Sequence, residues 1–296
     1  MNYDNKIEIS KQREYQVVKA NEIIQKARYD LNITELKTFA YIVSKIKPTD
    51  KLDQEYTISI KDFCQVCGMD YKNGGNYQFI KKTLKALRDK SFWLMDENGV
   101  ESTVGWLQKA RINRGSGKIV VKFDEDIQKY VIGLFNNFTQ YSLLSTLPMK
   151  SSYSFRMFEL LKSYAFAKQH TFDVEELKRL LGAEHYQNFK DFRKKVIEVA
   201  VKEINQYTDI EVSWEPITKG KKVIEVKFHI RNRDTMERVE TMFNAVDQIE
   251  GQISMFDYDY YNWVGGTNNL PTLFFWLYFP TMAAELPRSI FLKCMF

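Results

Sequence analysis

The stretch Thr171-Phe-Asp-Val-Glu-Glu-Leu-Lys-Arg-Leu-Leu-Gly182 sets the fold expected of this chain. Its apolar residues recur at the spacing of one helical face, Asp173 is placed to cap the start, and Gly182 can adopt the left-handed conformation that ends a helix. After a turn, residues 188–206 have the pattern of a longer helix with basic residues beside its apolar stripe. The residues expected in that stripe are Phe189, Phe192, Val196, Val199 and Ala200.

Two alternating segments, 210–217 and 222–231, follow this helix and flank a basic turn that contains Gly220. Alternation with period two around such a turn predicts a β-hairpin. Helix, turn, basic helix and basic hairpin form, in that order, a winged helix-turn-helix, in which the second helix enters a DNA major groove and the hairpin contacts the neighbouring backbone. The residues expected to contact DNA are Lys190, Arg193, Lys194, Lys195, Lys219, Lys221 and Lys222.

A basic helix taken alone is usually only a solvated face, but here the hairpin tip is basic too and the pattern occurs twice. Residues 57–68 align without a gap on residues 171–182, and Phe79-Ile-Lys-Lys82 matches Phe192-Arg-Lys-Lys195. A repeat of this kind indicates one folding unit used twice. In the first unit the basic helix is expected over residues 76–90, with Phe79, Ile80, Leu84 and Leu87 buried.

Strands of the first unit are expected over residues 92–95, 102–112 and 119–123, around turns at Asn98-Gly99 and 113–118. Its expected DNA contacts are Lys81, Lys82, Lys85, Arg88, Arg111, Arg114 and Lys118.

Each unit begins with a lead helix, expected over residues 32–46 with Thr34 as its cap and over residues 153–166. Residues 126–148 are expected to carry a helix and a connection, and residues 233–249 a final amphipathic helix. The predicted fold class is α+β, with two tandem winged helix-turn-helix domains related by an internal repeat. The predicted bounds are 1–14 for a flexible arm, 15–138 for the first winged helix, 139–250 for the second and 251–296 for an aromatic and apolar tail.

Charge is distributed as expected of a DNA-binding protein. The net charge of the 296 residues is only +5, but residues 76–122 contain ten Lys and Arg against four Asp and Glu, and residues 188–233 contain eleven against seven. The basic excess therefore lies on the two predicted DNA-binding units. No apolar stretch is long enough to span a bilayer, and three cysteines make no disulfide framework. We expect a cytoplasmic protein with no membrane association.

No motif in the sequence points to catalysis. Cys64 and Cys67 form a single pair without the second pair of a zinc site, so core packing is favoured over metal binding. The histidines are isolated, and Gly115-Ser-Gly-Lys118 lacks the first glycine of a phosphate-binding loop. Tyr153 has no base or metal site nearby in sequence to activate it. We expect no enzyme activity, no catalytic residue, no metal site and no cofactor.

The run Lys150-Ser-Ser-Tyr-Ser-Phe-Arg-Met-Phe-Glu-Leu-Leu161 resembles the signature of plasmid replication initiator (Rep) proteins that bind iterons. Their pattern in this place is Ser-x-Tyr-Ser-x-Arg-x-Tyr/Phe-Glu-Leu. Residues 17–24 and 31–46 also look like theirs, and the resemblance covers about residues 15–232. It implies tandem winged helices that bind directly repeated double-stranded DNA at a plasmid origin, opening of adjacent AT-rich DNA, and recruitment of host replication proteins such as a helicase or the host initiator.

The resemblance also implies self-association, in which a monomer initiates replication and a dimer, joined through the first winged helix, represses its own promoter. Two other functions fit the residues: a winged-helix transcriptional repressor without origin function, and an interaction module whose basic faces bind an acidic protein. The tail departs from the family pattern and has only two basic residues, Arg288 and Lys293. It could dock on a partner, pack on the second domain, or be a reading frame foreign to the family sequence.

Overall fold

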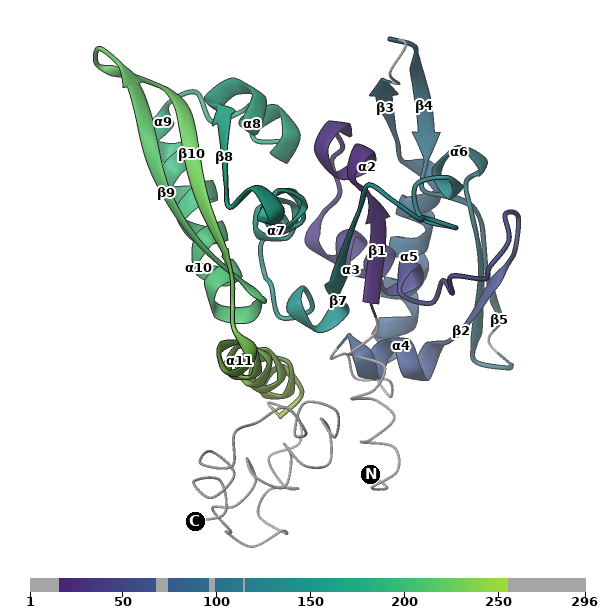
Figure 1. The fold of residues 1–296 in the computed structure, drawn as a ribbon. Coiled ribbons are helices and arrows are strands. Elements are labelled where there is room, and N and C mark those ends of the chain that lie inside the picture. The colour runs from purple at the N-terminus through teal and green to yellow at the C-terminus, as the bar shows by residue number, and fades with distance from the viewer. Residues whose placement is uncertain (1–15, 68–73, 96–98, 114, 255–296) are drawn as a thin grey trace, which may run out of the picture.

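The computed structural model describes residues 16–67, 74–95, 99–113 and 115–254 and contains two halves that lie side by side (Figure 1). Along the chain, the first half is drawn from purple through blue to teal, and the second from teal to green. Each half has a three-stranded antiparallel sheet with helices packed against it. This architecture confirms the α+β class and the two winged helices. The predicted arm, and the tail beyond residue 254, lie outside the described residues.

The second half carries the pattern from which the fold was predicted. Its elements are α7 (Ser152–Ser163), η2 (Ala165–Ala167), β8 (Gln169–Asp173), α8 (Val174–Leu181), α9 (Phe189–Phe192), η3 (Arg193–Ile197), α10 (Glu198–Tyr207), β9 (Ile210–Lys219) and β10 (Lys222–Asn232). The sheet has the strand order β8-β10-β9. Asp173 accepts hydrogen bonds from the backbone N–H of Glu175 (2.9 Å) and Glu176 (3.0 Å), and Gly182 ends α8 with a φ of +66°. Both predicted caps of α8 are therefore confirmed.

The first half repeats this order with an added hairpin. Its elements are β1 (Gln16–Ala20), α2 (Asn21–Lys26), α3 (Ile33–Val43), β2 (Tyr56–Ser59), α4 (Ile60–Val66), α5 (Gly74–Asp89), β3 (Ser91–Met95), β4 (Glu101–Gly105), β5 (Leu107–Asn113), β6 (Lys118–Phe123), α6 (Glu125–Gln128), β7 (Phe138–Ser142) and η1 (Leu143–Ser145). The sheet order is β2-β6-β5. Ser59 caps α4 by accepting from the Asp62 N–H at 3.2 Å, as Asp173 caps α8. The aligned stretches therefore fold alike, although Gly68 lies outside the described residues.

Three expectations for the first half need correction. The lead helix α3 is capped by Asn32 rather than Thr34, because the Asn32 side chain accepts from the backbone of Thr34 and Glu35 at 3.0 Å each and the Glu35 carboxylate accepts the Asn32 N–H at 2.9 Å. The single strand expected over residues 102–112 is two strands, β4 and β5, separated at the buried Trp106. The connection over residues 126–148 also contains a strand, β7, which pairs with β1.

The lead helix α7 joins the two halves through a buried polar group that we call the junction cluster. It consists of Lys19 from β1, Tyr29 after α2, Tyr141 from β7, and Arg156 and Glu159 from α7. Glu159 is fully buried, and its Oε1 accepts from the Lys19 ammonium and from the Tyr141 hydroxyl, each at 2.6 Å. Burial alone would raise the pKa of Glu159, but the charges of Lys19 and Arg156 and the hydrogen bonds to the carboxylate lower it.

Arg156 completes the contact between the halves. Its guanidinium lies 3.3 Å from Glu159 Oε2, bonds to the Tyr29 hydroxyl, and donates to the carbonyl oxygens of Ile24 (3.4 Å) and Ala27 (3.3 Å) at the end of α2. Arg156 and Glu159 are the two charged residues of the family pattern Ser-x-Tyr-Ser-x-Arg-x-Tyr/Phe-Glu-Leu. The structure gives that signature a physical role, because it fixes the second half on the first.

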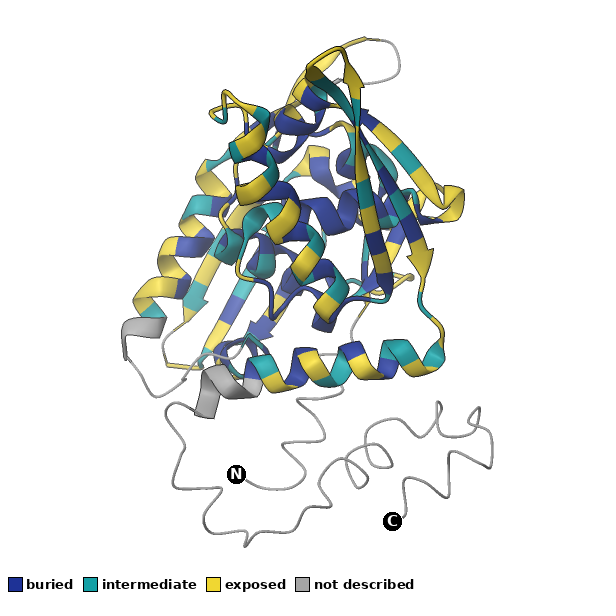
Figure 2. Cartoon of the chain, turned by 90° about the vertical axis from the view of Figure 1, so that its left-hand side faces the viewer, coloured by how far each residue is buried: buried dark blue, intermediate teal, exposed yellow. Residues whose placement is uncertain are grey.

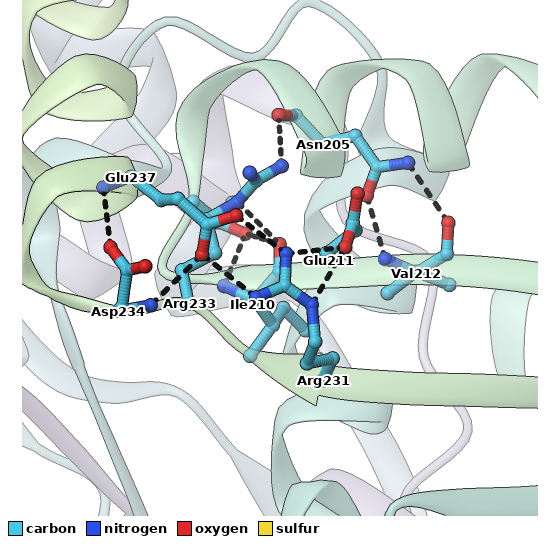
Figure 3. Close-up of polar contacts among 9 residues, drawn as sticks. Asn205, Ile210, Glu211, Val212, Arg231, Arg233, Asp234 and Glu237 are labelled. Carbon is cyan, nitrogen blue, oxygen red and sulfur yellow. Dashed lines mark hydrogen bonds and ion pairs between the residues drawn. The ribbon is translucent and has the colours of Figure 1, made fainter.

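The final helix α11 (Thr235–Ser254) confirms the helix predicted over residues 233–249 and packs on both α10 and η1. Figure 2 shows α11 across the base of the molecule, with exposed and buried residues alternating along it. Its start is fixed to the hairpin β9–β10, because the Arg231 guanidinium binds Glu237 at 2.7 and 2.8 Å and Glu211 at 2.6 and 2.8 Å (Figure 3). Asp234 and Glu237 cap the helix reciprocally, at 2.9 and 3.0 Å.

Candidate nucleic-acid interface

The second recognition helix, which we define as α9, η3 and α10 together, carries exposed basic residues beside a buried apolar stripe. Phe192, Val196 and Ala200 are fully buried against the second half. Four lysines outside this stripe are exposed: Lys190, Lys194, Lys195 and Lys202. Glu203 fixes the helix on the lead helix α7 by accepting the backbone N–H of Lys150 at 3.0 Å and of Ser151 at 3.3 Å. This anchoring holds the lysines on a rigid element, as recognition of a fixed groove requires.

The middle of this helix is a π-helix, η3, and not a regular α-helix. The wider turn shifts the apolar stripe, so Ile197 is fully buried and Val199 is 37% exposed. The expectation that Val199 lies in the core is therefore wrong, because it assumed the same spacing along the whole helix. Isolated π turns of this kind occur often at functional sites.

Arg193 follows the buried Phe192 in the second recognition helix. Its Nε is buried and lies 3.2 Å from Glu198 Oε1, which makes an ion pair by distance although the N–H direction does not complete a hydrogen bond. The side chain of Arg193 is 42% exposed. On the other side of the helix, the Lys195 ammonium lies over the ring of Tyr186, 5.7 Å from its centroid. The two cations are thus held in different directions.

The second wing, the hairpin β9–β10, has an exposed basic tip. Lys219 and Lys222 are paired across the turn, Gly220 has a φ of +64°, and Lys221 follows it. All three lysines are exposed. In the described part of the chain these lysines have no ion pair with an acidic side chain. A flexible cation on a hairpin tip is suited to phosphate contact, which needs charge rather than fixed geometry.

The first recognition helix, α5, exposes the cations that the repeat predicts. Lys81, Lys82 and Arg88 are exposed, and Lys85 is also exposed but forms an ion pair with Asp89 one turn later. The core assignment was partly wrong, because Phe79 is 41% exposed. The neighbouring Ile80, together with Leu84 and Leu87, is buried.

The burial pattern explains the error over Phe79. The sequence match aligns Phe79, which is exposed, with Phe192, which is fully buried. Ile80 is the first buried residue of the described side chains of α5, as Phe192 is in the second recognition helix. The structural equivalence of the two helices is therefore displaced by one residue from the sequence match, so Lys81 takes the place after the core residue that Arg193 has in the second half.

The first wing, the hairpin β5–β6, is also basic, although one of its cations is already paired. Arg111 forms an ion pair with Glu55, while Lys118 is exposed at the start of β6. The turn is closed by Ser116, whose backbone N–H donates to the Asn113 side chain at 3.2 Å. Arg114 lies outside the described residues. Figure 1 shows β2 and β5 at one side of the molecule and the hairpin β9–β10 at the other.

The set of expected DNA contacts omits Lys202 and Lys109, which are both exposed on these elements. Lys202 lies two turns after Lys194 on the exposed face of the second recognition helix, and Lys109 lies beside Arg111 on β5. The position of Lys202 off the apolar stripe follows from the spacing of the sequence alone. Within the described residues no group of three or more His, Cys, Asp or Glu side chains is placed to hold a metal ion. Among these residues, too, no helix has the length and apolar character needed to cross a bilayer.

Comparison with known proteins gives two family matches and a similar solved structure. Residues 16–162 match the family model described as "Initiator Replication protein, WH1", and residues 173–230 match "Initiator Rep protein, WH2". Together they cover more than half of the chain, and α11 lies beyond both. A solved structure titled "Crystal structure of Pi initiator protein in complex with iteron DNA" is similar with a TM-score of 0.62 and 19% identity, over 75% of this chain and 99% of that one. That likeness supports the fold.

Proposed function

Because the chain belongs to the initiator replication protein family, we propose that it binds directly repeated double-stranded DNA (iterons) at a plasmid origin and initiates replication there. The observation that carries the proposal is the pair of basic winged helices, held in one arrangement by the junction cluster. The similar Pi initiator, which its title describes in complex with iteron DNA, supports the same class of ligand.

The geometry supports a bipartite mode of binding. Each recognition helix would enter a major groove, and each wing would contact backbone phosphates beside it. Arg193 is the arginine of the second recognition helix. Its guanidinium can make a bidentate contact to guanine, worth about 1–3 kcal/mol of discrimination against the other bases. The lysines of the wing tips would contribute affinity for any sequence. Once one winged helix is bound, the second contact becomes intramolecular, so the whole chain should bind more tightly than either half.

Further steps in this proposal come from the family resemblance. They are opening of an adjacent AT-rich segment, recruitment of a host helicase or initiator, repression of its own promoter by a dimer, and action in the cytoplasm without catalysis. We also propose two folding domains followed by the tail. The predicted boundary between residues 138 and 139 falls inside β7, which pairs with β1. We therefore propose that the division lies after β7.

The first experiment measures binding to the candidate origin. The full chain is titrated against a duplex that carries the direct repeats next to its own reading frame and against a scrambled duplex of equal length. Lys194→Glu with Lys195→Glu should abolish preference for the repeats at physiological salt, because it reverses charge on the exposed face of the second recognition helix. The matched control is Lys47→Glu with Lys51→Glu, which changes two exposed lysines on the loop after α3. An equal loss of preference for the repeats in both double variants would show that net charge alone governs binding.

A second experiment separates an initiator from a repressor without origin function. Origin DNA is treated with a reagent specific for unpaired bases, with and without the protein. An initiator should make the AT-rich segment beside the repeats reactive, whereas a repressor should protect the repeats and leave the neighbouring duplex unreactive. Protection of the repeats with no reactive segment on supercoiled DNA would favour the repressor.

A further inference from the structure

The π turn in the second recognition helix brings together two residues that a regular helix would separate. In an α-helix, residues five apart point in directions about 140° apart. Here the backbone N–H of Glu198 donates to the carbonyl oxygen of Arg193, the five-residue step of a π-helix, and the two side chains lie 3.2 Å apart at Nε and Oε1. The same turn thus links Arg193 and Glu198 through both backbone and side chains.

The contact leaves part of the Arg193 guanidinium available. Guanidinium has five N–H donors, and Glu198 lies at Nε, whereas a bidentate contact to guanine can use the two terminal amino groups. Both side chains are partly exposed, 42% for Arg193 and 47% for Glu198. Each can therefore be changed without leaving a cavity in the core. The Arg193 Nε is buried 3.2 Å from the Glu198 carboxylate, whose negative charge favours a guanidinium in this place.

We propose that Glu198 is the positioning residue of the second recognition helix: it orients the Arg193 guanidinium toward one base of the DNA site. This inference rests on the proposed DNA-binding function. An arginine held in one direction before binding loses less conformational freedom when it contacts a base. The negative charge of Glu198 also disfavours approach of Arg193 to phosphate, which lowers affinity for DNA of other sequences.

A double-mutant cycle tests the proposal on the full chain. The proteins are the wild type, Arg193→Ala, Glu198→Ala and the double variant, and circular dichroism confirms that each is folded. The probes are a duplex that the wild-type protein selects from a random-sequence pool, every single-base variant of it, and a scrambled duplex. Affinity is measured by fluorescence anisotropy at one fixed salt concentration.

Discrimination is the ratio of the affinities for the selected duplex and for a single-base variant of it. Glu198→Ala should lower this ratio by on the order of tenfold at one base position, the same position that Arg193→Ala affects. In the Arg193→Ala background, Glu198→Ala should have no further effect on discrimination. Glu198→Gln should lower discrimination as Glu198→Ala does, because the Arg193 Nε lies beside the carboxylate charge without a complete hydrogen bond. The matched control Glu240→Ala, at an exposed position of α11, should leave discrimination unchanged.

Other outcomes overturn the proposal. If Glu198→Ala raises affinity for every duplex equally, Glu198 acts only through net charge. If it affects a different base from Arg193→Ala, or if the two effects add, Glu198 contacts the DNA by itself. A wild-type protein that selects a sequence but shows no coupling between the two residues overturns this inference alone. A wild-type protein that selects no sequence overturns the proposed function and this inference together.

Discussion

The two winged helices share the order of their elements but differ in how their recognition helices are built. In the first, α5 is regular between residues 74 and 89, and its Lys85 is paired with Asp89 on the next turn. In the second, the π-helix η3 interrupts the helix and pairs Arg193 with Glu198. A pairing on the next turn needs only a regular helix, whereas a pairing five residues away needs the local change of geometry. We infer that the second helix is the more specialised of the two for base recognition.

The largest expected effect tests the difference in the cores. Phe192 is fully buried, and replacement by Ala should lower the free energy of unfolding by about 3–5 kcal/mol, through lost burial and a remaining cavity. Phe79, its partner in the sequence match, is 41% exposed, and Phe79→Ala should change stability by about 0.5 kcal/mol or less. Urea denaturation followed by circular dichroism measures both. A similar loss of stability in the two variants would mean that Phe79 and Phe192 are equivalent, as the sequence match predicts.

The next effect tests whether the halves act as one unit. Glu159→Gln keeps the shape of the side chain but leaves Lys19 and Arg156 buried beside a neutral group, and should cost about 3 kcal/mol of stability. Arg28 and Glu176 also join the halves, at 3.1 Å, but their side chains are 53% and 33% exposed. Glu176→Gln should therefore cost at most about 1 kcal/mol. If both substitutions are equally mild, the junction cluster does not hold the halves together.

The sequence predicted what depends on local pattern. The caps Asp173 and Gly182 and the helix–turn–hairpin order were correct because each follows from a few neighbouring residues. The exposed lysines of both recognition helices were correct for the same reason. The contacts of the candidate DNA-binding residues are still predictions.

Features set by tertiary packing could not be predicted in this way. Strand β7 forms because β1, more than a hundred residues earlier, supplies its partner. The exposure of Phe79 and Val199 depends on which face each helix turns to its sheet and on the π turn, neither of which periodicity shows. The resemblance identified the stretch 150–161, but only the structure shows that Arg156 and Glu159 lie at the contact between halves.

A smaller effect compares the two wings. Lys221→Ala and Lys118→Ala each remove an exposed cation from a hairpin tip, and each should reduce the slope of log affinity against log salt by about 1 on every DNA sequence. Arg111→Ala should reduce the slope less, because its charge is already paired with Glu55. The measurement is affinity at several salt concentrations on repeat and scrambled duplexes. A normal slope for Lys118→Ala would mean that the first wing does not contact DNA.

The smallest effect concerns α11, which extends beyond the two matched family models. The hydrogen bonds from Arg231 and from the backbone of Asp234 hold the pKa of Glu237 at about 2, below its usual value of 4.5. A carboxyl whose pKa is lowered by folding stabilises the protein at neutral pH, and that stabilisation is lost as pH falls from about 4.5 to about 2. Glu237→Gln should therefore lower the thermal midpoint at pH 7 by a small amount, and the difference from wild type should narrow below pH 4.5. The control is Glu240→Gln, at an exposed position of the same helix, measured over the same pH range. A difference that stays constant down to pH 3 would mean that the shape of the side chain, and not its charge, fixes α11 to the hairpin.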